Sequence, residues 1–128
     1  MAKTYNLEAQ GVFTITDSSG LTIAAFDETH IFSNITSDTV QSGVISLTPG
    51  VSKKLNVKGI DTRVILYAKN ESNTGIVRIS NDDNVTQIIT LNPQEWCFIQ
   101  LIKPSADDDI YANAINADCN LTYILIEE

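Results

Sequence analysis

The chain has 128 residues, a mass of 14.0 kDa, a net charge of −8 and 43% hydrophobic residues. This length predicts a single domain over residues 1–128, with a core that needs neither metal nor disulfide to hold it. Such an acidic chain is poorly suited to nucleic acid, because phosphate backbones are bound by clustered basic residues. Polar residues interrupt every apolar run, so we also expect no membrane-spanning segment.

Short apolar runs separated by turn signals recur along the chain, and 38 of its 128 residues are Ile, Val or Thr, which suit a pleated strand. Residues 11–16 and 21–26 flank the sequence DSSG and predict a strand–turn–strand unit. Further runs follow at residues 44–47, 55–58, 63–69, 75–80, 85–91, 96–102, 110–115 and 120–127. No window carries a long helical stripe. We therefore predict an all-β fold, an antiparallel β-sandwich that is jelly-roll-like, with about 8 to 10 short strands.

The two cysteines lie in apolar rows of these predicted strands. Cys97 shares a strand face with Ile99, and Cys119 shares one with Leu121. Both are predicted to be small core residues, because a reactive thiol needs an electropositive, partly exposed setting. The first residues show no apolar stretch typical of a secretory signal, so we expect synthesis in a cytoplasm, where thiols stay reduced.

One histidine invites a catalytic interpretation. His30 follows Asp27 and Glu28, and a general base with an acidic neighbour could have this pattern. However, the chain has no second histidine and no Gly-x-Ser-x-Gly nucleophile turn. We therefore predict that His30 is an exposed loop residue, that the protein is not an enzyme, and that it uses no cofactor.

Two oxygen-rich segments, at residues 82–84 and 107–109, could attract a hard cation. Calcium needs six to eight oxygen ligands, and neither segment has the spacing of a helix–loop–helix calcium site. We interpret both as solvated turns and predict no metal site, with structural calcium at residues 107–109 as the alternative.

Aromatic residues offer a different kind of site. Trp96 and Tyr111 could form the platform of a carbohydrate-binding module, since sugar rings stack on exposed aromatic side chains. The competing interpretation is packing at the rim of the core, because the chain has only nine aromatic residues to fill it.

Charge is distributed unevenly along the chain. Residues 53–78 contain six basic and two acidic residues, a net charge of +4, whereas the remainder carries −12. Lys54 and Lys58 are an even number of positions apart and share a strand face. Together with Arg63 they are candidates for docking onto an acidic neighbour, including another copy of the chain. Lysines on an edge strand that block sheet-to-sheet aggregation explain the pattern equally well.

The C-terminal third resembles a known family. The sequences LNPQEWCFIQL at residues 91–101, IYANA at 110–114 and CNLTYILIEE at 119–128 are similar to those of small virion proteins of tailed phages. The resemblance covers residues 85–128 and implies a β-sandwich that is closed by its last strand. The family includes capsid decoration proteins and tail accessory proteins.

We therefore expect a non-enzymatic virion protein that binds the phage capsid as a decoration or cement subunit. A tail-associated accessory protein and a carbohydrate-binding module are the alternatives. The expected partners are major capsid or tail proteins and further copies of the chain, with a trimer among the candidate homo-oligomers.

Overall fold

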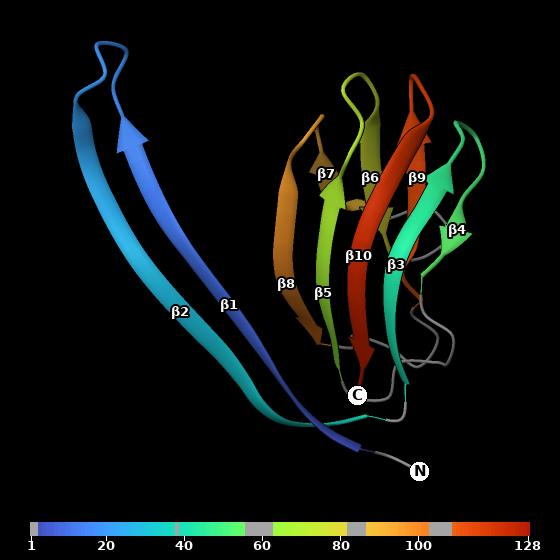
Figure 1. The fold of residues 1–128 in the computed structure, drawn as a ribbon. Helices are drawn as coiled ribbons and strands as arrows, with labels where there is room; N and C mark the ends of the chain where they lie inside the picture. Colours follow the sequence, from blue (N-terminus) through green and yellow to red (C-terminus); the bar gives the residue numbers. More distant parts are fainter. Residues whose placement is uncertain (1–2, 38, 56–62, 82–86, 103–108) are drawn as a thin grey trace. The chain divides into compact units, whose positions relative to one another are not determined.

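The computed structural model describes residues 3–37, 39–55, 63–81, 87–102 and 109–128, and these form strands and connections without a helix (Figure 1). The strands are β1 (Lys3–Thr16), β2 (Thr22–Ser37), β3 (Thr39–Leu47), β4 (Lys53–Lys54), β5 (Arg63–Asn70), β6 (Ile76–Ser80), β7 (Gln87–Leu91), β8 (Trp96–Ile102), β9 (Tyr111–Ile115) and β10 (Cys119–Glu127). The predicted all-β fold is confirmed.

Eight of these strands form two packed sheets, with the orders β3-β10-β5-β8 and β4-β9-β6-β7. Figure 1 shows the first sheet in front of the second. The pairs are antiparallel and nested in chain order: β3 pairs with β10, β4 with β9, β5 with β8, and β6 with β7. Such a set of nested pairs, wound across two sheets, is the topology of a jelly roll. The predicted antiparallel, jelly-roll-like sandwich is therefore confirmed.

The core lies between the two sheets because alternate residues of each strand point inward. In β5 the inward residues are Val64, Leu66 and Ala68, all fully buried. β10 contributes Leu121 and Leu125 to the same cluster, and both are also fully buried. The residues between these positions consequently point to the outer face of the sheet.

The two thiols belong to this core. Cys97 and Cys119 are both free and buried, which confirms the prediction made from strand parity. Burial raises the pKa of the Cys97 thiol to about 11, since the thiolate is poorly solvated there. Burial also raises the pKa of Cys119.

Residues 2–36 form a compact unit separate from residues 37–128. Within this unit β1 and β2 make a two-stranded sheet. Its turn is stabilised by Asp17, whose Oδ1 accepts hydrogen bonds from Ser19 N at 2.9 Å, Ser19 Oγ at 2.7 Å and Leu21 N at 2.9 Å. The Ser19 hydroxyl and the Leu21 amide accordingly lower the pKa of the Asp17 carboxyl. The predicted strand–turn–strand unit is confirmed, and the single domain expected over residues 1–128 stays a prediction.

The hairpin strands are longer than the six-residue runs predicted, at 14 and 16 residues. As a result His30 lies within β2, and its assignment to a loop was wrong. A two-stranded ribbon leaves charged neighbours such as Asp27 and Glu28 in solvent, so they do not interrupt the strand. The His30 ring is exposed and meets Phe32 edge-on, with ring centroids 4.4 Å apart.

The buried Cys97 thiol predicts a pH-dependent stability. Between the ordinary pKa near 9.0 and the folded value of about 11, the unfolded chain releases this proton and the folded protein retains it. The free energy of unfolding should therefore fall as pH rises through this range, because the unfolded state gives up a proton that the folded state keeps. Below this range Cys97 should have no effect on how the free energy of unfolding depends on pH. Urea unfolding at a series of pH values should give a shallower decline for Cys97→Ala than for the wild type. Equal declines would contradict the prediction.

Candidate functional site

The outward side of the sheet β3-β10-β5-β8 is unusually apolar for a solvated surface. We call this side the outer face. Its apolar members are Val40 and Val44 from β3, Ile124 and Ile126 from β10, Ile65 and Tyr67 from β5, and Trp96 and Phe98 from β8. Strand register aligns them in rows across the sheet: Ile124 lies opposite Tyr67, and Tyr67 lies opposite Phe98. Ile124, Tyr67 and Phe98 therefore form one apolar row across three strands, whereas the row that joins Val44 to Trp96 passes through Thr122 and Lys69.

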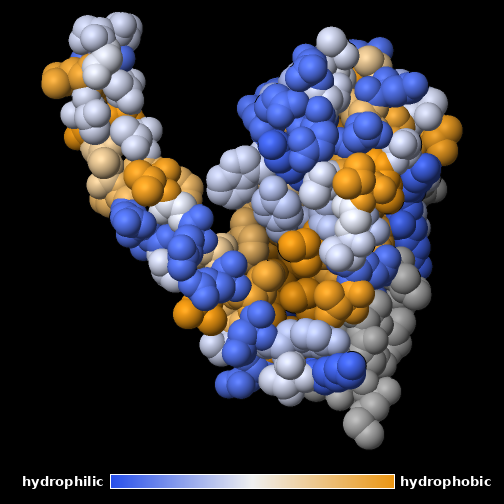
Figure 2. Space-filling view, viewed as in Figure 1, coloured by the Kyte–Doolittle hydropathy of each residue, from blue (hydrophilic) through white to orange (hydrophobic). Residues whose placement is uncertain are grey.

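The exposed apolar residues of this face lie on its two edge strands, β3 and β8. Val44 is 63% exposed, Trp96 is 51% exposed and Val40 is 41% exposed, whereas Ile65 and Ile126 are buried. Figure 2 shows hydrophobic residues in separate groups on this side, with hydrophilic residues between them. Large apolar side chains exposed on a sheet face are typical of a protein interaction site.

A polar cluster lies at one end of the outer face. The Arg63 guanidinium donates from Nε at 3.1 Å and from Nη2 at 2.9 Å to Glu128 Oε2, and from Nη1 at 3.0 Å to Gln100 Oε1. Backbone hydrogen bonds in both directions between Arg63 and Glu128 continue the pairing of β5 with the C-terminal segment. Arg63 therefore joins three strands of the sheet at this end.

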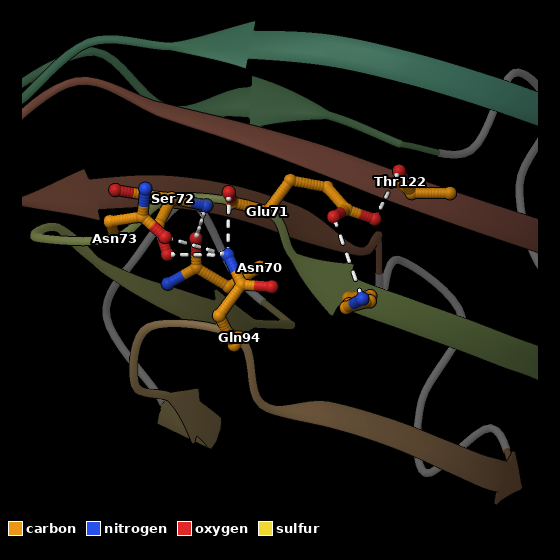
Figure 3. Close-up of polar contacts among 7 residues, drawn as sticks. Asn70, Glu71, Ser72, Asn73, Gln94 and Thr122 are labelled. Atoms are coloured by element: carbon orange, nitrogen blue, oxygen red, sulfur yellow. Dashed lines mark hydrogen bonds and ion pairs between the residues drawn. The ribbon is translucent and has the colours of Figure 1, made fainter.

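A second polar cluster fixes the opposite end, where Trp96 begins β8 (Figure 3). Its centre is Asn70, which is fully buried. The Asn70 amide nitrogen donates to the carbonyls of Gly75 at 2.8 Å and Leu91 at 3.1 Å, and its side-chain oxygen accepts from Ser72 N at 3.0 Å. One side chain thereby satisfies two backbone groups of the β5–β6 connection and one at the end of β7.

Gln94 stabilises the turn that precedes Trp96. Its backbone has a φ of 67°, in the left-handed region that residues with a Cβ adopt only at a cost. Its Nε2 donates to the carbonyls of Glu71 at 2.9 Å and Ser72 at 3.2 Å, and its backbone N–H donates to Asn70 O at 2.9 Å. Figure 3 shows these side chains converging between the two loops. The bonds offset the backbone strain and hold the start of β8 in place.

The two predicted docking cations that the structure describes lie on different sheets. Lys54 lies on β4, an edge strand of the second sheet, with Nζ 3.2 Å from Asp109 Oδ2. Arg63 lies on β5 of the first sheet and pairs with Glu128 at 2.9 Å. Lys58 lies outside the described residues. The edge position of Lys54 fits the alternative of a lysine that discourages strand addition. Docking through these three residues stays a prediction.

Trp96 and Tyr111 are not brought together either. Trp96 is on the outer face of the first sheet, whereas Tyr111 is on β9 of the second, on the side opposite its buried neighbour Ala112. The two aromatic side chains thus point away from each other, with the core between them. The ring nearest to Trp96 in an aromatic contact is that of Tyr67, with centroids 6.4 Å apart.

The two oxygen-rich segments considered as metal sites lie mostly outside the described residues. Among the residues that the structure describes, no group of three or more His, Cys, Asp or Glu side chains could hold a metal ion. Residues 82–84, 107 and 108 lie outside that part of the chain. Asp109 is described, and it pairs with Lys54.

Sequence reasoning placed Cys97 and Ile99 on one side of their strand, which leaves Trp96 and Phe98 on the other, but it missed the outer face as a whole. β5 reads as an almost unbroken apolar run, so its outward residues Ile65 and Tyr67 could not be told from its core residues. A pairing of β5 with β8 and β10 was needed to reveal the surface.

No family model matches this chain, and no curated protein matches it. In the described part of the chain, no helix is long and apolar enough to cross a membrane.

The Asn70 cluster predicts a loss of stability on substitution. Asn70→Ala leaves buried carbonyls without donors and should lower the free energy of unfolding by about 1–3 kcal/mol. Asn70→Asp keeps the shape and the bond from Ser72 N but loses both donated bonds, so it should be comparably destabilised. Chemical denaturation followed by Trp96 fluorescence measures both. An Asn70→Asp variant as stable as the wild type would refute the role of these bonds.

Proposed function

We propose that this protein is a non-enzymatic structural subunit of a phage virion, which binds the capsid as a decoration protein. The observation that supports this proposal best is the outer face, an apolar surface with Val44 and Trp96 more than half exposed. The resemblance of residues 85–128 to small virion proteins of tailed phages favours the virion as the setting. A tail protein in place of the capsid is the alternative partner.

The proposed mechanism is static. A sheet in which β10 pairs on both sides is a stiff support, so the outer face loses little conformational freedom when a partner covers it. The Asn70 and Arg63 clusters fix its two ends. Burial of the apolar side chains supplies the affinity, and many copies on one particle make weak individual contacts collectively strong.

Electrostatic docking has a smaller part in this mechanism. Lys54 and Arg63 already have carboxylate partners within the chain, so a new anionic partner would have to compete with Asp109 and Glu128. Rim charges of this kind act mainly on the rate of association and its salt dependence.

Capsid binding can be tested by co-sedimentation of the purified protein with particles that lack it. Val44→Glu places a charge on the outer face and should weaken binding by about tenfold or more, because a buried unpaired charge is costly. The matched control is Val51→Glu, since Val51 has a similar exposure of 52% but lies in the connection after β3. Lys54→Glu with Lys58→Glu should change mainly the salt dependence.

Equal binding by the Val44→Glu protein and the wild type would exclude the outer face as the docking surface. Failure of the wild type to bind either capsids or tails would overturn the virion proposal itself. If only the variant with Lys54→Glu and Lys58→Glu lost binding, the docking surface would be assigned to residues 54–63 and not to the outer face.

A carbohydrate-binding module is a second candidate, favoured by the exposure of Trp96 beside Tyr67. Two adjacent rings on a stiff sheet can stack against a sugar. Trp96 is the only tryptophan, so its fluorescence reports on this position alone. Host polysaccharide should quench this emission, and Tyr67→Ala should weaken the effect. Unchanged emission with every glycan tested would remove this candidate.

A further inference from the structure

A cavity of about 270 Å³ lies at the end of the sandwich where three connections meet. Figure 1 shows the β3–β4, β5–β6 and β9–β10 connections at this same end. They contribute Thr48, Ser72 and Asp118 to the lining, and the adjoining strands β3 and β10 contribute Ser46 and Asn120. The volume is close to the lower limit of ligand sites, roughly 300 Å³, and suits one small unit of a ligand.

The wall of the cavity is tightly packed behind its polar groups. Cys119 lines it and is buried, and a Cβ added at Gly75 would overlap with Cys119 Sγ. Ser72 Oγ accepts hydrogen bonds from Thr74 N at 3.1 Å and Gly75 N at 2.9 Å, which fixes the β5–β6 connection. The cavity is therefore formed before a ligand arrives, and binding would cost little ordering of the chain.

Two side chains of the lining offer complementary hydrogen-bonding groups. Ser46 lies opposite Asn120 in the register of β3 with β10, and its Oγ donates to Asn120 Oδ1 at 3.1 Å. This bond orients the Asn120 amide, and no described residue accepts a hydrogen bond from its Nδ2. The exposed Asp118 carboxylate forms no hydrogen bond or ion pair with a described residue. A donor and an acceptor are thus both available at the cavity.

The lining disfavours several classes of ligand. Among the described residues that line the cavity none is basic, so an anion would meet Asp118 without a counter-charge. One carboxylate is too few for calcium, which takes six to eight oxygen ligands. An apolar ligand would leave the hydroxyl, amide and carboxylate groups unpaired. A neutral ligand with several hydroxyls fits best, because each hydroxyl both donates and accepts.

We propose that this cavity binds one unit of a neutral sugar chain, with Asn120 Nδ2 donating to one hydroxyl and the Asp118 carboxylate accepting from another. The proposal rests on the carbohydrate-binding candidate and extends it beyond Trp96. Thr122 follows Asn120 on the same side of β10, and Thr122, Lys69 and Trp96 lie in register across β10, β5 and β8. Two strand spacings, about 10 Å, separate β10 from β8, a distance that an oligosaccharide can span.

The test begins with binding of the purified full-length chain to an array of neutral and acidic oligosaccharides. The neutral oligosaccharide bound best is then titrated by calorimetry. Asn120→Ala and Asp118→Ala should each raise its dissociation constant about five- to tenfold, the loss of one hydrogen bond. Asn116→Gly is the matched control, because Asn116 is an exposed residue of the same turn that does not line the cavity. Glycine tolerates its φ of 75°, so this variant should bind like the wild type.

A second measurement needs no variant. In NMR spectra of the wild type, the backbone amide signals of Asp118 and Asn120 should shift as the same oligosaccharide is added. The amide signal of Gln100, toward the other end of the sheet, should stay in place.

Three outcomes would overturn the proposal: no neutral oligosaccharide on the array is bound, only acidic ones are bound, or both cavity variants bind like the wild type. If both variants bind normally while the oligosaccharide still quenches Trp96 fluorescence, the sugar lies on the Trp96 platform and not in the cavity. Failure of the cavity is thereby distinguished from failure of the carbohydrate candidate. Capsid binding is measured separately, through Val44→Glu.

Discussion

The sheet β3-β10-β5-β8 depends on the insertion of β10 between two strands that do not pair with each other. All nine residues of β10 are paired with β3, and seven of them are also paired with β5. Removing this strand would separate β3 from the rest of the sheet and take Leu121 and Leu125 out of the core. Because β10 joins segments far apart in the sequence, the sheet can be completed only after most of the chain has been positioned.

The same insertion creates the outer face. Inward residues of β10 fill the space between the sheets, so its outward residues, Ile124 and Ile126, must lie on the opposite side. There they meet Tyr67 and Ile65 of β5 in register. Stability and binding are thus coupled through one strand: the pairing that completes the core also assembles the surface that we assign to the partner.

The hairpin and the sandwich use one sequence pattern with different results. In the sandwich, alternating apolar residues are covered by the opposite sheet and become fully buried, as Val77 and Ile79 of β6 are. In the hairpin the same alternation leaves Phe13 and Ile23 more than half exposed. The difference lies in the number of layers that each unit contains, because the hairpin is a single two-stranded sheet.

The sequence by itself determined the fold class, because Ile, Val and Thr in short runs favour strands and turn residues separate them. Strand parity also determined that Cys97 and Cys119 face the core, since alternation is a property of a single strand. Only the tertiary structure decided that Trp96 and Tyr111 lie on opposite sides, that His30 lies within a strand, and that Lys54 and Arg63 belong to different sheets. Those facts depend on which strands pair. Pairing between distant segments is set by packing across the whole core, and a local sequence pattern does not specify that packing.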